Sequence, residues 1–121
     1  MPQKIIFWDW TGTLADEARM DEAVCRSMEE EVARRDGIPF EEAERRFKAH
    51  LRKLEGTWQW HDYVLHGNAL GVNWKRHQEM HLKEIVLLSH AREMLEYSRE
   101  RGYKNILVTN AVRPVITLRV G

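Results

Sequence analysis

The sequence has little cysteine, little proline and no long hydrophobic run. Its 121 residues include one cysteine and 3 prolines. A single thiol, Cys25, excludes an intrachain disulfide framework and a zinc site built on several thiolates. The apolar runs are far shorter than the roughly 20 residues that span a bilayer. The N-terminal residues lack the apolar segment and cleavage site of a signal peptide, so we expect a cytoplasmic protein.

An excess of charge of one sign is also missing. Lys and Arg number 19, Asp and Glu number 19, and the formal net charge is zero. This balance gives no support for nucleic acid or an anionic membrane as a partner. Hydrophobic residues make up 43% and charged residues 31%, which is typical of a folded chain rather than a disordered one. The length fits one domain or part of one.

Two continuous apolar runs predict strands of a parallel sheet. The first is Lys4–Asp9, and the second covers residues 105–109. Runs of this kind suit strands that are covered on both faces. Two strands joined by a crossover connection are expected to be parallel, and the connection is expected to be right-handed. Both strands then end at the same edge of the sheet, where ligands bind in open α/β folds, and Asp9 and Thr109 lie side by side there.

The segment between the two strands, residues 16–88, has the pattern of several helices. Apolar residues recur at helical spacing from Met20 to Val32, and Asp36-Gly37 ends this helix. Pro39 begins a second helix, which has one apolar stripe. This helix ends at Gly56. An aromatic-rich segment follows. A further helix is predicted over residues 73–86.

The C-terminal part begins with a helix that starts at Ser89 or His90 and ends at Gly102 in the left-handed conformation. The predicted strand 105–109 comes next. The tail, residues 112–121, is ambiguous. Pro114 at a first-turn position favours a helix, whereas the β-branched residues that follow favour a strand.

The residues after the first strand can carry chemistry. Asp9 stands at a strand end, before the turn Thr11-Gly12-Thr13. Its carboxylate could act as a nucleophile or hold a hard cation. Gly12 would let backbone N–H groups approach an anion closely. The alternative is that Asp9 only caps the turn.

The run Ile5-Ile6-Phe7-Trp8-Asp9-Trp10-Thr11-Gly12-Thr13-Leu14 resembles the first motif of the haloacid dehalogenase-like (HAD) superfamily. That motif is an apolar strand followed by Asp-x-Asp-Gly-Thr-Leu, and Asp16 falls where many members carry another acidic residue. Residues 90–110 resemble the later segment, in which a helix ending in Arg-Gly-Tyr leads to a strand closed by Thr and often Asn. The resemblance implies an α/β fold with a truncated, Rossmann-like parallel-sheet core from residues 1–15 and 89–121. Residues 16–88 would then be an inserted helical cap of the C1 type.

The resemblance also implies roles for individual residues. Asp9 matches the nucleophile that forms a covalent aspartyl intermediate. Its side chain and the backbone carbonyl of Thr11 match the Mg²⁺ ligands of the phosphatase members. The phosphate-binding positions correspond to Gly12, Thr13, Thr109 and Asn110. The implied function is hydrolysis of a small phosphorylated substrate, with Mg²⁺ as cofactor.

The sequence departs from the family pattern at Thr11. Phosphatases carry a second aspartate there, as the general acid and base. Threonine cannot replace that function near neutral pH, and loss of such a step typically costs about 10²–10⁴-fold in rate. P-type ATPases carry Thr at this position, and haloacid dehalogenases carry Tyr. A metal-independent 2-haloacid dehalogenase is therefore one alternative.

No segment after Thr109 matches the later motifs of the family, which supply a Lys or Arg and an acidic pair at the metal. Arg113 lies too early to match that basic residue, so neither role is assigned. The chain is therefore expected to be either a fragment of a longer protein or an obligate oligomer, with residues 115–120 as a candidate extra strand. A non-catalytic, oligomeric interaction protein is the second alternative.

Other polar and aromatic groups are predicted to be structural. His77 and His81 are spaced like metal ligands on a helix but lack a third ligand, so they are expected to be packed or solvated. Cys25 is expected to be a small buried side chain. The run Glu29-Glu30-Glu31 is expected to form a solvated helix face. An aromatic cluster suits the core more often than a substrate pocket, and its members are Trp58, Trp60, His61 and Tyr63.

Overall fold

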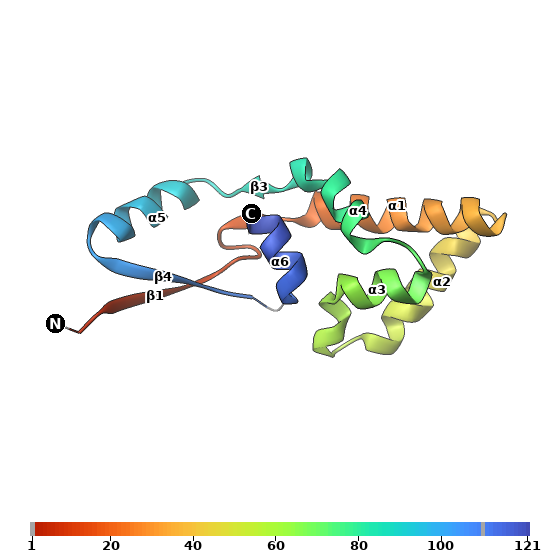
Figure 1. Ribbon diagram of the computed structural model, residues 1–121, viewed down its shortest axis with the longest axis horizontal. Helices are drawn as coiled ribbons and strands as arrows, with labels where there is room; N and C mark the ends of the chain where they lie inside the picture. Colours follow the sequence, from red (N-terminus) through yellow and green to blue (C-terminus); the bar gives the residue numbers. More distant parts are fainter. Residues whose placement is uncertain (1, 110) are drawn as a thin grey trace.

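The structure is a computed structural model that describes residues 2–109 and 111–121. The molecule is elongated, with a two-stranded sheet toward one end and a group of helices at the other (Figure 1). Its elements are β1 (Lys4–Asp9), β2 (Ala15–Asp16), α1 (Ala18–Asp36), α2 (Phe40–Leu54), η1 (Trp58–His61), α3 (Tyr63–Leu70), α4 (Trp74–Met80), η2 (Leu82–Glu84), β3 (Val86–Leu87), α5 (Ala91–Glu100), β4 (Tyr103–Val108) and α6 (Arg113–Val120).

The two predicted core strands are parallel neighbours, which confirms the crossover argument. Lys4 of β1 pairs with Tyr103 of β4, and Asp9 pairs with Val108. Strand β4 begins two positions before the predicted residue 105 and ends just before Thr109. Asp9 and Thr109 therefore leave the sheet at the same edge.

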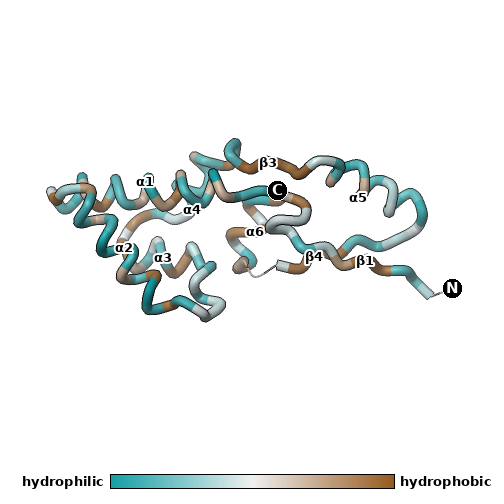
Figure 2. The backbone as a smooth tube through the Cα atoms, turned by 180° about the vertical axis from the view of Figure 1, so that it is seen from behind, coloured by the Kyte–Doolittle hydropathy of each residue, from teal (hydrophilic) through white to brown (hydrophobic). Residues whose placement is uncertain are grey.

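Only one face of this sheet is covered by the described residues. Trp8 Nε1 donates to Asn105 Oδ1 at 2.9 Å, and Asn105 Nδ2 donates to the Leu95 carbonyl of α5. The opposite face carries Ile5 and Phe7, whose side chains are 45% and 66% exposed. Figure 2 shows hydrophobic stretches in both β1 and β4. Within the described residues, these strands therefore lack the cover on both faces that their apolar runs predict.

Helices α1 and α2 form the main hydrophobic core. The stripe predicted from Met20 to Val32 is buried, and it packs against Ala43 and Phe47 of α2. Gly37 ends α1 with φ of 65°, a left-handed conformation that costs glycine little. Pro39, which lacks an N–H, precedes the first turn of α2. These boundaries match the sequence pattern.

The helix predicted over residues 73–86 is shorter in the structure. Asn73 Oδ1 accepts from the backbone N–H groups of Lys75 and Arg76, which caps the start of α4. The apolar residues at the end of the prediction form β3 instead, because β2 offers a strand edge for antiparallel pairing. This short ribbon joins the two ends of the helical segment, close to the predicted boundaries of the cap.

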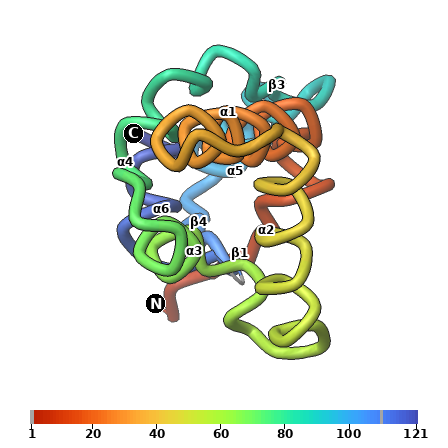
Figure 3. The backbone as a smooth tube through the Cα atoms, turned by 90° about the vertical axis from the view of Figure 1, so that its right-hand side faces the viewer, coloured from red at the N-terminus to blue at the C-terminus, as the bar shows by residue number. Residues whose placement is uncertain are grey.

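The C-terminal tail is a helix. Pro114 lies in the first turn of α6, and Val115 is buried. The helix packs against α3 and α4 (Figure 3). The alternative in which residues 115–120 extend the sheet is therefore wrong. As a helix, this segment buries Val115 and packs Ile116 against Trp10, Leu14 and Ala15, while Val120 stays exposed.

The glutamate run in α1 is not a wholly solvated face. Glu29 is only 7% exposed, and burial raises the pKa of its carboxyl group. Glu31 is paired with Arg76 and lies 3.2 Å from His77 Nε2.

Among the described residues, no helix is both long and apolar enough to cross a membrane.

Candidate active site

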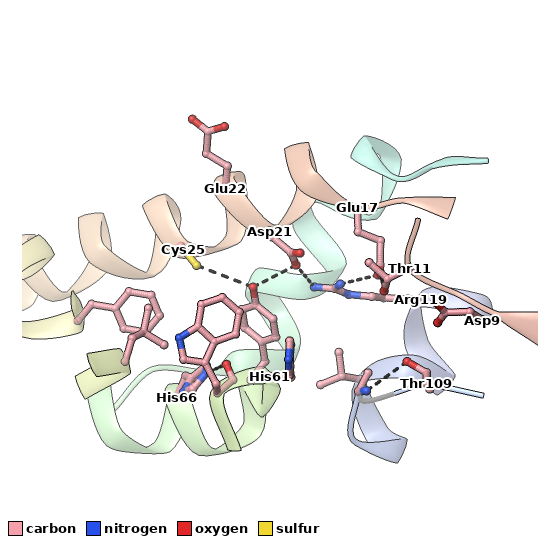
Figure 4. A pocket seen from close by; sticks show the side chains of 16 residues that line it. Asp9, Thr11, Glu17, Asp21, Glu22, Cys25, His61, His66, Thr109 and Arg119 are labelled. Atoms are coloured by element: carbon pink, nitrogen blue, oxygen red, sulfur yellow. Dashed lines mark hydrogen bonds and ion pairs between the residues drawn. The ribbon is translucent and has the colours of Figure 1, made fainter. Parts of the chain in front are cut away.

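The edge of the sheet where Asp9 and Thr109 lie opens onto a cavity of about 620 Å³. Asp9 ends β1, Thr11 lies in the turn after it and Thr109 follows β4, and all three line the cavity. Tyr63 comes from the helical segment and Arg119 from α6. Figure 4 shows Asp9 and Thr11 together at one end of the cavity, with Thr109 below them. Asp9 and Thr109 therefore line the same cavity, as their predicted positions at the sheet edge require.

The turn after Asp9 is held by its own backbone. The N–H groups of Leu14 and Ala15 both donate to the Trp10 carbonyl, and the Gly12 N–H donates to the Ala15 carbonyl at 2.9 Å. Gly12 has φ of 79°, which explains why glycine stands at this position. Gly12 and Thr13 do not line the cavity. Asn110 lies outside the described residues, so the phosphate-binding roles of these three residues stay predictions.

A carboxylate that no sequence motif indicates contacts Thr11. The Thr11 hydroxyl donates to Glu17 Oε1 at 2.7 Å. Glu17 precedes α1, lines the same cavity and is only 4% exposed. Its other oxygen, Oε2, accepts from Arg119 Nη1 at 2.5 Å. No local pattern could reveal this contact, because 102 positions separate Glu17 from Arg119.

The Arg119 guanidinium is hydrogen-bonded at all three of its nitrogens. Besides Glu17, it donates from Nη2 to Asp21 Oδ1 at 2.8 Å and from Nε to Gln78 Oε1 at 2.9 Å. Burial opposes its charge, but the carboxylates of Asp21 and Glu17 outweigh that effect and raise the pKa of Arg119. Arg119 thus fixes helix α6 to the start of α1, through a buried ion pair with Glu17 and a partly exposed one with Asp21.

Two neutral side chains, Tyr63 and Cys25, extend this network beyond Asp21. The Tyr63 hydroxyl donates to Asp21 Oδ1 at 3.0 Å, and Cys25 Sγ lies 3.9 Å from the same hydroxyl. Burial raises the pKa of Tyr63 well above its ordinary value, and it raises the pKa of the Cys25 thiol to about 11. Cys25 is partly buried rather than fully buried, as it borders the cavity.

The aromatic cluster is divided between the cavity and the solvent. Trp60, His61 and Tyr63 line the cavity, whereas Trp58 is 62% exposed. The core assignment is therefore wrong for Trp58, for the 44% exposed Trp60 and for the exposed His61, whereas Tyr63 packs against the core. Next to them, His66 Nε2 donates to the Trp60 carbonyl at 2.9 Å, so its Nδ1 accepts from His50 Nε2.

Few of these groups could bind a metal. Among residues 2–109 and 111–121, no three or more His, Cys, Asp or Glu side chains cluster in a way that could hold an ion. His77 is buried, with Nδ1 at 2.8 Å from Ser27 Oγ and Nε2 near Glu31, so its ring nitrogens already have partners. The Asp9 carboxylate and the Thr11 carbonyl are oxygen donors of the kind Mg²⁺ prefers, and Mg²⁺ commonly keeps several waters.

Comparison with known proteins agrees with this architecture. The model of the haloacid dehalogenase-like hydrolase family matches residues 3–121. The chain therefore belongs to the haloacid dehalogenase-like hydrolases. The resemblance stated from the motif around Asp9 is confirmed.

A solved structure with the same fold is a HAD phosphatase from Thermococcus onnurineus, with a TM-score of 0.83 and 21% sequence identity. The match covers 98% of this chain and 55% of that one, so the chain spans little more than half of its length. The α/β, HAD-like fold with a parallel sheet is thus confirmed. No curated protein matches the sequence.

Proposed function

We propose that this chain carries the nucleophile end of a phosphatase active site and acts on a small phosphorylated substrate through Asp9. One observation carries the proposal. Asp9 and Thr109 end neighbouring parallel strands and face one cavity of about 620 Å³, which is large enough for a small molecule. The phosphatase named among the solved structures supports this choice of reaction, at the level of shared fold.

Each residue has a definite task in this proposal. The Asp9 carboxylate attacks phosphorus and forms an aspartyl phosphate, while the bond from phosphorus to the leaving oxygen of the substrate breaks and that oxygen keeps the electron pair. The Thr109 hydroxyl accepts from the Ala111 N–H at 3.1 Å, which orients its oxygen and leaves its proton for a phosphoryl oxygen. Asp9 and the Thr11 carbonyl would hold Mg²⁺. When bound, this ion neutralises charge on the phosphoryl group.

Binding of a phosphoryl mimic tests the site directly. Beryllium fluoride with Mg²⁺ should raise the melting temperature of the complete encoded protein. A ligand at 100 times its Kd stabilises a protein by about 2.7 kcal/mol. Asp9→Asn should lose this stabilisation, because beryllium fluoride binds to a carboxylate oxygen.

A matched control is Asp16→Asn. Asp16 is also an exposed carboxylate near the first motif, but it accepts from the Ala18 N–H and does not line the cavity. This variant should keep the response to beryllium fluoride. No stabilisation of the unchanged protein at high ligand excess would contradict the proposal. Removal of Mg²⁺ by a chelator separates the phosphatase from a metal-independent dehalogenase.

A further inference from the structure

The fold places the buried carboxylate of Glu17 next to Thr11, which has a hydroxyl instead of a carboxylate. Thr11 stands where the family's phosphatases carry the aspartate that transfers protons. We propose that Glu17 replaces this aspartate in the second half-reaction, acting through the Thr11 hydroxyl. The proposal rests on the phosphatase function of the preceding section, since it concerns hydrolysis of the Asp9 phosphate.

The geometry of the pair suits proton transfer. The Thr11 hydroxyl donates to Glu17 Oε1 at 2.7 Å, a normal distance for such a bond. A hydroxyl has one proton to donate and two lone pairs that accept. With its proton directed at Glu17, Thr11 offers only acceptor sites to the cavity. Asp9, Thr11 and Glu17 all line that cavity, and they lie together in Figure 4.

Arg119 holds Glu17 in place for this task. Its guanidinium binds Glu17 Oε2, and its own position is fixed by Asp21 and Gln78. An ionised carboxylate only accepts hydrogen bonds, so Glu17 as part of an ion pair faces Thr11 as an acceptor. The side chains of Glu17 and Arg119 are each 4% exposed, which keeps the pair out of bulk water.

In the second half-reaction, the proton of the attacking water is transferred by way of Thr11 to Glu17. A water oxygen attacks the phosphorus of the aspartyl phosphate, and the bond from phosphorus to the Asp9 oxygen breaks. Asp9 keeps the electron pair and returns to a carboxylate. The proton of the water passes to Thr11 Oγ1, while the Thr11 hydroxyl proton passes to Glu17 Oε1. The products are inorganic phosphate and protonated Glu17, which returns its proton to solvent through Thr11 and the cavity.

The same arrangement predicts which substrates react well. Both carboxylate oxygens of Glu17 accept hydrogen bonds, from Thr11 and from Arg119, so this geometry directs no proton toward a leaving group in the first half-reaction. Substrates whose leaving oxygen departs without a proton should therefore transfer their phosphoryl group readily. These are acyl phosphates and aryl phosphates. Alkyl phosphates need a proton donor at that step and should react slowly.

The test compares two products of p-nitrophenyl phosphate in the complete encoded protein. Release of p-nitrophenol reports the first half-reaction, and release of phosphate reports the second. Glu17→Gln should still release one equivalent of p-nitrophenol in a burst, while phosphate release falls by about 10²–10⁴-fold. Asp21→Asn is the matched control. It removes the other carboxylate of Arg119 but leaves the bond between Thr11 and Glu17, so phosphate release should fall far less.

Substitutions of Thr11 test the relay without disturbing the ion pair. Thr11→Val removes the hydroxyl at nearly equal volume and should reproduce the burst and the slow phosphate release. Thr11→Ser keeps a hydroxyl and should restore phosphate release. In a Thr11→Asp background, where the carboxylate is supplied directly, Glu17→Gln should have little effect, a strong departure from additivity.

The outcomes separate this inference from the proposed function. If the unchanged protein releases no p-nitrophenol, the proposed function fails, and the inference fails with it. If the unchanged protein turns over, and Glu17→Gln and Thr11→Val release phosphate at the same rate as it does, the inference alone is overturned. Equal losses from Glu17→Gln in the Thr11 and Thr11→Asp backgrounds would also overturn it, because they would indicate a purely structural role.

Discussion

Arg119 in the last helix contacts Glu17, just before the first helix, at 2.5 Å and across 102 positions of the chain. This contact joins α6 to the start of the helical segment and lies next to Thr11. Both side chains are almost fully buried. The ion pair therefore has consequences for stability as well as for the site.

Arg119→Ala should destabilise the protein by about 3–5 kcal/mol, because removal of one partner leaves a buried carboxylate without its countercharge. Denaturant unfolding measures this change. Arg113→Ala is the control in the same helix, since Arg113 is exposed, and it should change the free energy of unfolding by less than about 0.5 kcal/mol. Similar effects of the two substitutions would contradict the structural role of Arg119.

The sequence predicted the parts of this site that follow local rules. A continuous apolar run ending in Asp9 indicated a strand, and the turn with Gly12 indicated where it ends. The second run placed Thr109 beside Asp9, because crossover connections have a fixed hand. Gly37 and Pro39 likewise marked a helix end and a helix start.

The rest depends on contacts between distant segments. Nothing near Glu17 in the sequence indicates that Arg119 would neutralise it. The β-branched residues of the tail suit a strand by propensity, and only packing of α6 against α3 and α4 decides for a helix. The burial of Glu29 and the exposure of Phe7 also follow from which surfaces meet, which local patterns do not encode.

Acid should weaken the fold through His50 and His66. Desolvation lowers the pKa of both side chains below the ordinary 6.5, so the folded state resists protonation that the unfolded state accepts. Their contribution to stability is present above about pH 6.5 and is lost as the pH falls toward their folded pKa values. The free energy of unfolding should therefore decrease between about pH 7 and pH 5.

The variant His66→Gln should show a shallower decrease over this pH range, because the desolvated imidazole is gone. His90→Gln is the control, since the His90 side chain is 70% exposed. Urea unfolding at several pH values measures the slopes. An unchanged slope in His66→Gln would show that other groups control the acid sensitivity.

Cys25 should react slowly with alkylating reagents although it borders the cavity. Burial raises the pKa of its thiol from 9.0 to about 11. Only the thiolate is a nucleophile, so its reactive fraction near pH 8 should be about 100-fold below that of an ordinary cysteine. The rate of labelling by iodoacetamide, followed by intact mass, measures this. Labelling at the rate of the urea-unfolded chain would contradict the buried environment.

The open face of the sheet should make the 121-residue chain associate when it is isolated. Ile5 and Phe7 expose apolar area on β1, and strand surfaces of this kind pair with other chains. Replacement of Phe7 by Lys should reduce this association in sedimentation experiments. Val120→Lys, a change at another exposed apolar residue, should not. A monodisperse unchanged chain would refute the prediction.

The central claim is that Asp9 is the nucleophile, and the mass of the Asp9 peptide tests it most directly. The complete encoded protein is mixed with p-nitrophenyl phosphate and Mg²⁺, quenched in acid within its turnover time, digested and analysed by mass spectrometry. The account predicts that the peptide containing Asp9 gains one phosphoryl group, that Glu17→Gln increases the modified fraction, and that Asp9→Asn abolishes it. Turnover of the substrate with the phosphoryl group on another residue, or undiminished turnover in Asp9→Asn, would contradict the account.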